Sequence, residues 1–421
     1  MMMDLNAFCL FLQLNETDKI KLEPVWEKLT ADWNGKPPFF LEQDYFDRLY
    51  PLCQSIFPLE QVRPLAAEII RIVRENPEAA LLAHITYYGS FLLDPEIKFD
   101  FLPDPLPFFG QEYSGMFGLM ISLGAYPLIV KAYAEAGVPE KYAQAALLSI
   151  GGTMIAYSAA HNGKAGRPYQ FSWNRLYIEK KLFRIGRLEY RMHPCPSWVP
   201  AIYRNQQGDL AVICRDGWRF RPDGRWAGMN DPSGITTHFM ETEDSISGIP
   251  CFPDGKVDFD HPKTLLRSEW QSVVSPWDLC PSIHIPAGSR MPFEEIKVSL
   301  LAARDFFTEY FHRRVPLFVC SSWILNPAWE TLLHHSNMAQ FRQECFAFPS
   351  SSWHPKCGMR FIFGRDDISP LDLPAANSLQ DTYQKAFRQD QIENGSLFVL
   401  TDDLEKLGNQ YYRKNFSMIH A

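Results

Sequence analysis

The chain has 421 residues, no paired-cysteine motif and no long run of basic residues. Its 9 cysteines are an odd number, and no two of them form a C-x-x-C pair. This usage argues against a thiolate metal site and a dense disulfide framework, and it indicates a reducing compartment. We therefore expect no bound metal. Because the formal net charge is −8 and basic runs are missing, we expect no nucleic acid partner either.

The sequence also lacks a convincing leader or membrane segment. The N-terminal apolar stretch has no preceding Lys or Arg, and Asp4 is acidic, so it is a poor signal peptide. Residues 115–130 are apolar but short for a membrane span, and Pro127 interrupts them. A buried core helix is the better interpretation. We therefore expect a cytoplasmic protein with no membrane partner.

The composition is that of a folded protein, with 46% hydrophobic, 14% aromatic and 21% charged residues. Disordered and low-complexity chains have far fewer apolar residues. A chain of this length exceeds one ordinary hydrophobic core, so two domains are expected. We place the border near the glycines of residues 163–168, which gives domains at 1–165 and 166–421.

The first domain is predicted to be helical. Residues 62–76 place four apolar residues on one stripe, which is the spacing of an amphipathic helix: Leu65, Ile69, Ile72 and Val73. Residues 77–88 continue as a second helix, and residues 115–137 and 141–157 are predicted as two more apolar helices. The last contains Gly151 and Gly152, which either break it or allow a close crossing.

The second domain is predicted to mix strands and helices. Residues 171–191 still have partly helical character, and hairpin patterns fill residues 200–259. Later segments predict strands at 316–323, 343–348, 359–363 and 396–400, and a helix at 379–389. The order of helices, antiparallel strands and then alternating strands and helices predicts an α+β fold: an all-helical N-terminal domain followed by a mixed-sheet domain.

Residues 279–311 are the most informative segment. Residues 281–286 (PSIHIP) alternate apolar and polar side chains, as a strand does. A turn with Gly288 and Arg290 follows, and Pro292 stands where a helix should begin. A helix start carries unpaired N–H groups that suit phosphate oxygens. Glu294 and Glu295 in the first turn would repel a phosphate, and most such units bind nothing at the turn.

Four segments resemble a bacterial family of two-domain acyltransferases: residues 242–257 (TEDSISGIPCFPDGKV), 275–291, 318–325 and 373–379 (LPAANSL). In that family a helical N-terminal domain precedes a domain like the GNAT fold, the fold of acetyl-CoA-dependent N-acyltransferases. The resemblance extends over most of the chain from about residue 43 onward. It implies an acetyl-CoA or other acyl-CoA donor and an amine acceptor on a small molecule or peptide.

The resemblance also implies positions for the donor. The central strand would be residues 282–286, its splayed neighbour residues 317–322, and the pyrophosphate loop residues 287–291. The residues implied in cofactor binding are Ile285, Ala287, Gly288, Ser289 and Arg290. The family loop usually has the form Q/R-x-x-G-x-G/A, whereas this chain has one glycine and an arginine after it.

Three residues are candidates for acid, base or nucleophile. His284 on the proposed central strand would serve as a base, or its ring is a structural hydrogen-bonding group. Glu241, in an acidic segment with Asp244, would act as a base, with Asp244 binding an amine; a solvated loop is the alternative. Cys320 would be a nucleophile or a small buried apolar residue. Trp323 would line a substrate pocket or belong to the core.

Three functions remain open from the sequence. The first is an acyl-CoA-dependent N-acyltransferase in which an amine attacks the thioester directly. The second is a binding or regulatory protein that keeps the GNAT-like fold without turnover, which the single glycine favours. The third is a hydrolase that uses Cys320 with His284. The sequence gives no indication of the oligomeric state.

Overall fold

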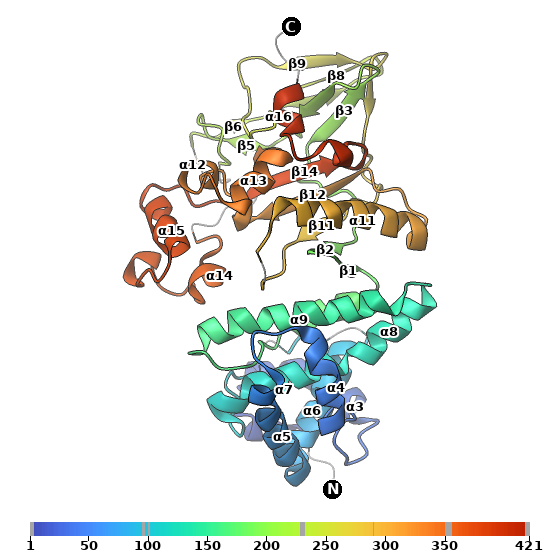
Figure 1. Cartoon of the computed structure of the whole chain (residues 1–421), viewed down its shortest axis with the longest axis vertical. Helices are drawn as coiled ribbons and strands as arrows, with labels where there is room; N and C mark the ends of the chain where they lie inside the picture. The colour runs from blue at the N-terminus through green and yellow to red at the C-terminus, as the bar shows by residue number, and fades with distance from the viewer. Residues whose placement is uncertain are drawn as a thin grey trace. The chain divides into compact units, whose positions relative to one another are not determined.

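The fold is described from a computed structural model (Figure 1). It describes residues 4–94, 97–99, 102–227, 232–288, 290–349 and 356–416. The chain forms two compact units. Unit 1 contains Met1–Arg184 and Pro286–Ser289, and unit 2 contains Ile185–Ile285 and Arg290–Ala421. Residues 166–184, which the sequence assigns to the second domain, are counted with unit 1 here; the predicted domain limits stay a prediction.

Unit 1 is built from α-helices, as the sequence predicts. Its α-helices are α1 (Leu5–Phe11), α2 (Glu16–Leu22), α3 (Trp26–Thr30), α4 (Gln43–Leu49), α5 (Leu59–Glu75), α6 (Pro77–Phe91), α7 (Gly110–Gly124), α8 (Tyr126–Glu135), α9 (Glu140–Ala160) and α10 (Phe171–Ile178). Helix α5 confirms the amphipathic pattern, because Val62, Ile69 and Val73 are buried on one side of it.

One apolar segment of unit 1 differs from its prediction. The single helix expected at residues 115–137 is wrong, because α7 and α8 are separate helices on either side of Ala125, with Pro127 in the first turn of α8. The segment Gly110–Glu135 is long and apolar enough to cross a membrane, yet 72% of its most apolar window is buried inside the protein. That burial agrees with helices in the core of a folded domain, the interpretation given above for residues 115–130.

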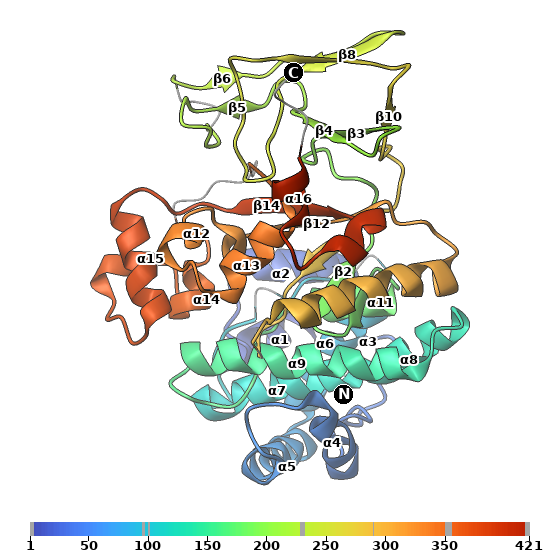
Figure 2. The ribbon, with the colours of Figure 1, turned by 45° about the horizontal axis from the view of Figure 1, so that its top comes forward.

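The main sheet has six strands in the order β1-β2-β11-β12-β14-β13, and all of them except most of β1 belong to unit 2. The central strands β11 and β12 run parallel, whereas β2–β11, β12–β14 and β13–β14 are antiparallel. Helix α11 (Phe293–Phe311) contacts β2 of this sheet and lies beside it in Figures 1 and 2. The strands of this sheet are β1 (Leu182–Ile185), β2 (Leu188–Arg191), β11 (Ser282–His284), β12 (Leu317–Ser322), β13 (Phe346–Pro349) and β14 (Gly395–Leu400).

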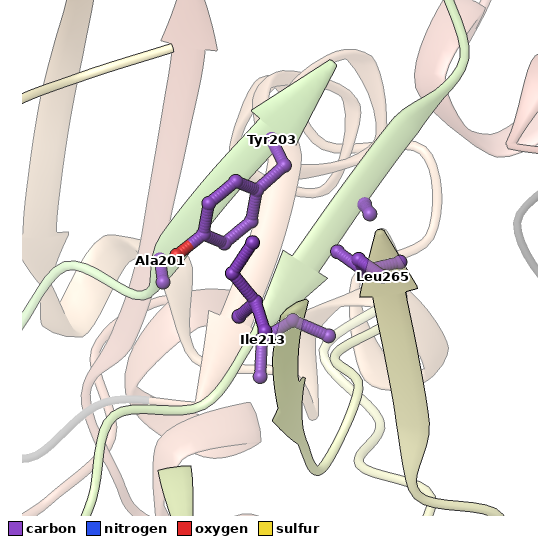
Figure 3. Close-up of a cluster of buried hydrophobic side chains, with 6 residues drawn as sticks. Ala201, Tyr203, Ile213 and Leu265 are labelled. Carbon is purple, nitrogen blue, oxygen red and sulfur yellow. The ribbon is translucent and has the colours of Figure 1, made fainter. Parts of the chain in front are cut away.

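A small β-rich insert separates β2 from β11 in the sequence. It forms a sheet β10-β3-β4, a pair β5-β6 and a sheet β7-β8-β9, drawn together in Figure 2. Its buried cluster includes Ala201, Tyr203, Ile213 and Leu265 (Figure 3). Its strands are β3 (Ala201–Asn205), β4 (Leu210–Ile213), β5 (Arg219–Phe220), β6 (Ile235–Thr236), β7 (Phe239–Glu241), β8 (Ser245–Gly248), β9 (Lys263–Leu266) and β10 (Trp270–Ser272).

Short helices complete unit 2, and several pack around a buried cluster that contains Trp329, Met359 and Tyr383. They are α12 (Trp329–Leu332), α13 (Asn337–Glu344), α14 (Met359–Phe363), α15 (Ser378–Arg388) and α16 (Tyr411–Asn415). The prediction of an α+β fold, with helices first and a mixed sheet after them, is confirmed.

Two segments have a different secondary structure from the one predicted. The prediction of helical character beyond α10 is wrong, because residues 182–185 and 188–191 form the strands β1 and β2. The strand expected at 359–363 is helix α14, which lies between Gly358 and Gly364, both with positive φ. Periodicity does not separate helix from strand in an apolar run of five residues. The predicted strands at 316–323 and 396–400 and the predicted helix at 379–389 match β12, β14 and α15.

The Gly151–Gly152 pair does not break α9, which is continuous. A Cβ added at Gly151 would lie 2.1 Å from the carbonyl oxygen of Cys53, and one added at Gly152 would lie 2.7 Å from that of Ala287. Both atoms belong to unit 1. The glycines therefore let two backbone segments approach the helix.

We expect Gly151→Ala to destabilise the protein. Helix propensity alone predicts the opposite, a gain of about 1 kcal/mol from replacing glycine in a helix interior. The added methyl group would clash with the Cys53 backbone, which has little freedom to move, so we expect a net loss of about 1–3 kcal/mol. Urea unfolding of the variant and the wild type measures the sign. A gain in stability would contradict the close approach.

Candidate functional site

The two central strands of the sheet separate after a single residue pair. Ser282 is registered with Val319, and the N–H of Val319 donates to the Pro281 carbonyl at 3.1 Å. Beyond that pair β11 stays registered with β2 through His284, and β12 stays registered with β14 through Ser322. Beyond Ser282 and Val319, the facing backbone edges of β11 and β12 are therefore not paired with each other.

The side chains along this opening agree with a separation of the strands. Ser321 is solvent-exposed although β12 is an interior strand of the sheet. The thiol of Cys320 donates to the Ile283 carbonyl at 3.4 Å and so satisfies one backbone acceptor of β11. Backbone groups in such an opening need partners, and an extended ligand can supply them.

The loop after β11 leads into the N-terminus of α11. Gly288 has φ 122°, a conformation that side-chain-bearing residues rarely adopt. The Arg290 carbonyl accepts from Nε of the buried Arg187 at 3.1 Å, while the Arg290 side chain is exposed. Pro292 is the N-cap rather than the first helical residue predicted, and no side chain caps the helix. The N–H groups of Phe293 and Glu294 thus have no partner within the helix, whereas that of Glu295 donates to the Pro292 carbonyl at 3.1 Å.

Alternation along β2 and β11 gives the sheet one apolar and one polar face. On the apolar face, Tyr190 is in hydrogen-bond contact with Ser299 of α11 at 2.8 Å, and its ring packs 5.3 Å from Phe318. On the opposite face the registered pairs are Glu189 with His284 and Arg191 with Ser282. This confirms the alternation predicted for residues 281–286 as far as His284, with Ile283 buried and its neighbours half-buried; β11 ends there, and Ile285 is half-buried too.

A histidine that the sequence analysis did not single out joins this polar face. The pairing of β2 with β11 continues past the strand ends, because the Cys280 N–H donates to the His193 carbonyl at 3.1 Å and Pro194 bridges Leu279. His193 therefore lies diagonal to Ser282. Nδ1 of His193 donates to the Pro194 carbonyl at 2.7 Å, which leaves Nε2 as the acceptor for the Ser282 hydroxyl.

Both histidines on this face favour the neutral form. Burial, together with the neighbouring Arg191 and His193, lowers the pKa of His284 to about 4. Burial also lowers the pKa of His193, and Arg191 adds to that effect, while the hydrogen bond to Pro194 opposes it. Neutral imidazoles accept protons. His193 is the better base of the two, because a pKa near 4 makes His284 weakly basic.

The other predicted site residues lie in different places. Glu241, on the insert, accepts from the Tyr203 hydroxyl at 2.8 Å and pairs with Arg267 at 3.5 Å. Asp244 is exposed in the turn between β7 and β8. The structure does not place these two on the six-stranded sheet with His284.

Cys320 shows no sign of an activated nucleophile. Its side chain is buried, and burial raises the pKa of the thiol to about 12. Cysteine chemistry depends on the thiolate, and a raised pKa suppresses it. The environment of Cys320 corresponds to the alternative role given above, that of a small buried residue.

Trp323 follows the last residue of β12 directly. Its ring stacks on Phe361 at 6.3 Å, and Gly358 lies so close that an added Cβ would be 2.6 Å from it. Of the loop residues, Ile285 is half-buried, and Ala287 and Gly288 are exposed. Ser289 lies outside the described residues. Within the described ranges, no cluster of three or more His, Cys, Asp or Glu side chains is arranged to hold a metal ion.

We expect His284 to make stability fall at acidic pH. Its folded-state pKa of about 4 lies below the ordinary value of 6.5, so between these values the unfolded chain binds a proton that the folded chain does not. The free energy of unfolding then drops by at most about 1.4 kcal/mol per pH unit. Urea unfolding between pH 7.5 and 5 should show a smaller loss for His284→Gln than for the wild type. Equal losses would contradict this burial of a neutral ring.

Comparisons with known proteins agree with the fold described above. A family model described as the GNAT-like C-terminal domain matches residues 182–395, about half of the chain. The search of curated proteins finds no match.

Solved structures with the same fold include three complexes of acyltransferases. One, in complex with decanoyl-CoA and teicoplanin, has a TM-score of 0.61 and 17% identity, and covers 95% of this chain and 100% of its own. Another, with CoA and 10C-teicoplanin, has a TM-score of 0.60 and 16% identity, with coverage of 95% and 100%. A mutant with octanoyl-CoA has a TM-score of 0.59 and 17% identity, with coverage of 94% and 99%.

At these identities the likeness shows the fold. The family match covers the sheet from β1 to the start of β14, including the separation of β11 from β12. The chain therefore belongs to the family of proteins with a GNAT-like C-terminal domain.

Proposed function

We propose that the protein is an acyl-CoA-dependent N-acyltransferase that acts on an amine of a small molecule or peptide. The observation that carries the proposal is the separation of the parallel strands β11 and β12, followed by a loop and the uncapped start of α11. An extended thioester carrier needs backbone partners along its arm and N–H groups for its phosphates. The open edges of β11 and β12 offer the backbone partners, and the start of α11 offers the N–H groups.

The same geometry gives the donor a direction. The diphosphate would bind at the wide end of the opening, at the N-terminus of α11, with the Arg290 guanidinium as a charged contact. The pantetheine arm would follow residues 283–285. The thioester would then lie at the narrow end, near Ser282 and Val319.

His193 is our choice for the base. In the proposed step an amine attacks the thioester carbonyl, a C–N bond forms, and the C–S bond breaks to release the thiolate. Nε2 of His193, which faces Ser282 at the narrow end, would take the proton from the amine. Backbone N–H groups of the open strands would stabilise the oxyanion. His284 would line the arm as a neutral polar group.

The choice of acyl group rests on the structural neighbours. Those acyltransferases were solved with decanoyl-CoA and octanoyl-CoA, so we propose an acyl-CoA donor without restricting it to acetyl-CoA. One neighbour complex contains teicoplanin, and for this chain we propose only the amine class of acceptor.

Glu294 and Glu295 favour the second candidate, a binding protein without turnover. Both carboxylates are exposed in the first turn of α11, where they would weaken phosphate binding. Binding of decanoyl-CoA without product formation across a panel of amines would support this candidate over the enzyme.

We expect His193→Gln to bind decanoyl-CoA with unchanged affinity but to transfer the acyl group more slowly. Removing a positioned base reduces the rate by roughly 10²–10⁴-fold. Calorimetry measures the affinity, and mass spectrometry of a panel of primary amines that includes teicoplanin measures the product. A wild-type rate in the variant would show that His193 is not the base.

The rate of transfer should also depend on pH. Because His193 acts in its neutral form and its pKa lies below 6.5, the midpoint of the acidic loss of rate should lie below pH 6.5. Titration of the amine itself adds a second dependence at higher pH, so the acidic limb should be compared between wild type and His193→Gln. An acidic limb that is identical in the two proteins would contradict the assignment.

Arg290→Ala should weaken CoA binding. A hydrogen bond to a charged group contributes roughly 1.5–3 kcal/mol, and because the side chain is exposed we expect the low end, a loss of about tenfold. Arg313→Ala is the matched control, since Arg313 is exposed just past the opposite end of the same helix. Equal affinities of the two variants for CoA would remove Arg290 from the site.

A further inference from the structure

The Ser282 hydroxyl has the surroundings of an activated nucleophile: a base in hydrogen-bond contact with it, and a group that orients the base. It donates to Nε2 of His193, and Nδ1 of that ring donates to the Pro194 carbonyl at 2.7 Å. A base within hydrogen-bond reach of the hydroxyl, oriented by a third group, is the arrangement that activates serine for acyl chemistry. Here a backbone carbonyl takes the part of the orienting group.

Ser282 also stands at the narrow end of the opening. It is the last residue of β11 registered with β12. If the diphosphate occupies the wide end, as the proposed function requires, the thioester carbonyl reaches this residue. The half-buried hydroxyl lies on the polar face, whereas the buried Cys320 thiol is hydrogen-bonded to Ile283.

The charges around Ser282 suit the formation of an anion. Arg191 is registered directly opposite Ser282, and its side chain is exposed on the same face. Glu189, on that face, is registered with His284 rather than with Ser282. A guanidinium beside the carbonyl stabilises the negative charge of a tetrahedral intermediate, and the lowered pKa of His193 keeps its ring available as a base near neutral pH.

We propose that, when no amine occupies the site, Ser282 attacks the acyl-CoA thioester and the protein hydrolyses it through an acyl-serine. This second activity, a thioesterase, rests on the proposed function for its donor. In the first step the Oγ–C bond forms and the C–S bond breaks, while His193 moves the Oγ proton to the sulfur and free CoA leaves. In the second step water attacks the ester, His193 moves its proton to Oγ, and the carboxylic acid leaves.

The test uses the full chain and decanoyl-CoA without an acceptor. Release of free thiol should be continuous, and acid quenching should trap a mass increase of one decanoyl group on the peptide that contains Ser282. Ser282→Ala should lose the adduct and reduce thiol release by roughly 10²-fold or more, while its affinity for decanoyl-CoA by calorimetry stays unchanged. Ser247→Ala, which removes an exposed hydroxyl on β8, should keep both the adduct and thiol release.

A second variant distinguishes loss of the nucleophile from loss of folding. Ser282→Cys is nearly isosteric and retains a nucleophile, so its adduct should become a thioester that neutral hydroxylamine cleaves. Wild-type thiol release in Ser282→Ala, or an adduct on another residue, would overturn the acyl-serine while leaving the transferase intact. Failure of the wild type to bind decanoyl-CoA at all would overturn the proposed function and the inference with it.

Discussion

The pairing of β11 with β12 stops after Ser282 and Val319, and the proposed chemistry depends on the backbone that this leaves open. The strands are held apart from outside: β11 is registered with β2, and β12 is registered with β14 along its whole length. Tyr190 and Phe318 pack together on the apolar face, and Tyr190 also contacts Ser299 of α11. A buried backbone group without a partner costs free energy. The opening therefore favours a ligand whose amide groups can hydrogen-bond to the strand backbone.

The polar face of the sheet follows from the same register. Because successive side chains alternate, placing Tyr190 and Ile283 toward the apolar face puts Arg191 and Ser282 on the other one. The ladder then continues past both strand ends and brings His193 beside Ser282. A slip of one residue in this pairing would exchange the two faces and separate the hydroxyl from the ring.

The sequence predicted the parts of the site that depend on local patterns. Alternation in residues 281–286 predicted β11, and Pro292 predicted that a helix begins where α11 does. His193 escaped notice, because its proximity to Ser282 is set by a pairing between residues about 90 positions apart. No local pattern encodes that register.

The same limit explains the errors. Residues 182–191 were expected to be partly helical, yet long-range pairing in the sheet makes them β1 and β2. Glu241 and Asp244 were chosen for their charge, and their roles stay predictions; Glu241 ends β7 of the insert, and Asp244 lies in the turn that follows. Residue type suggested the chemistry of Cys320, whereas its burial and its bond to Ile283 were decided by tertiary packing.

Amide hydrogen exchange with and without decanoyl-CoA tests the central claim most directly. If the carrier occupies the opening, protection should increase in the peptides that contain residues 283–288, residues 320–322 and the first turn of α11, because ligand groups would bond to these amides. Peptides of the insert strands β7 and β8 should exchange as before. Protection confined to other segments, with the opening unchanged, would contradict the account.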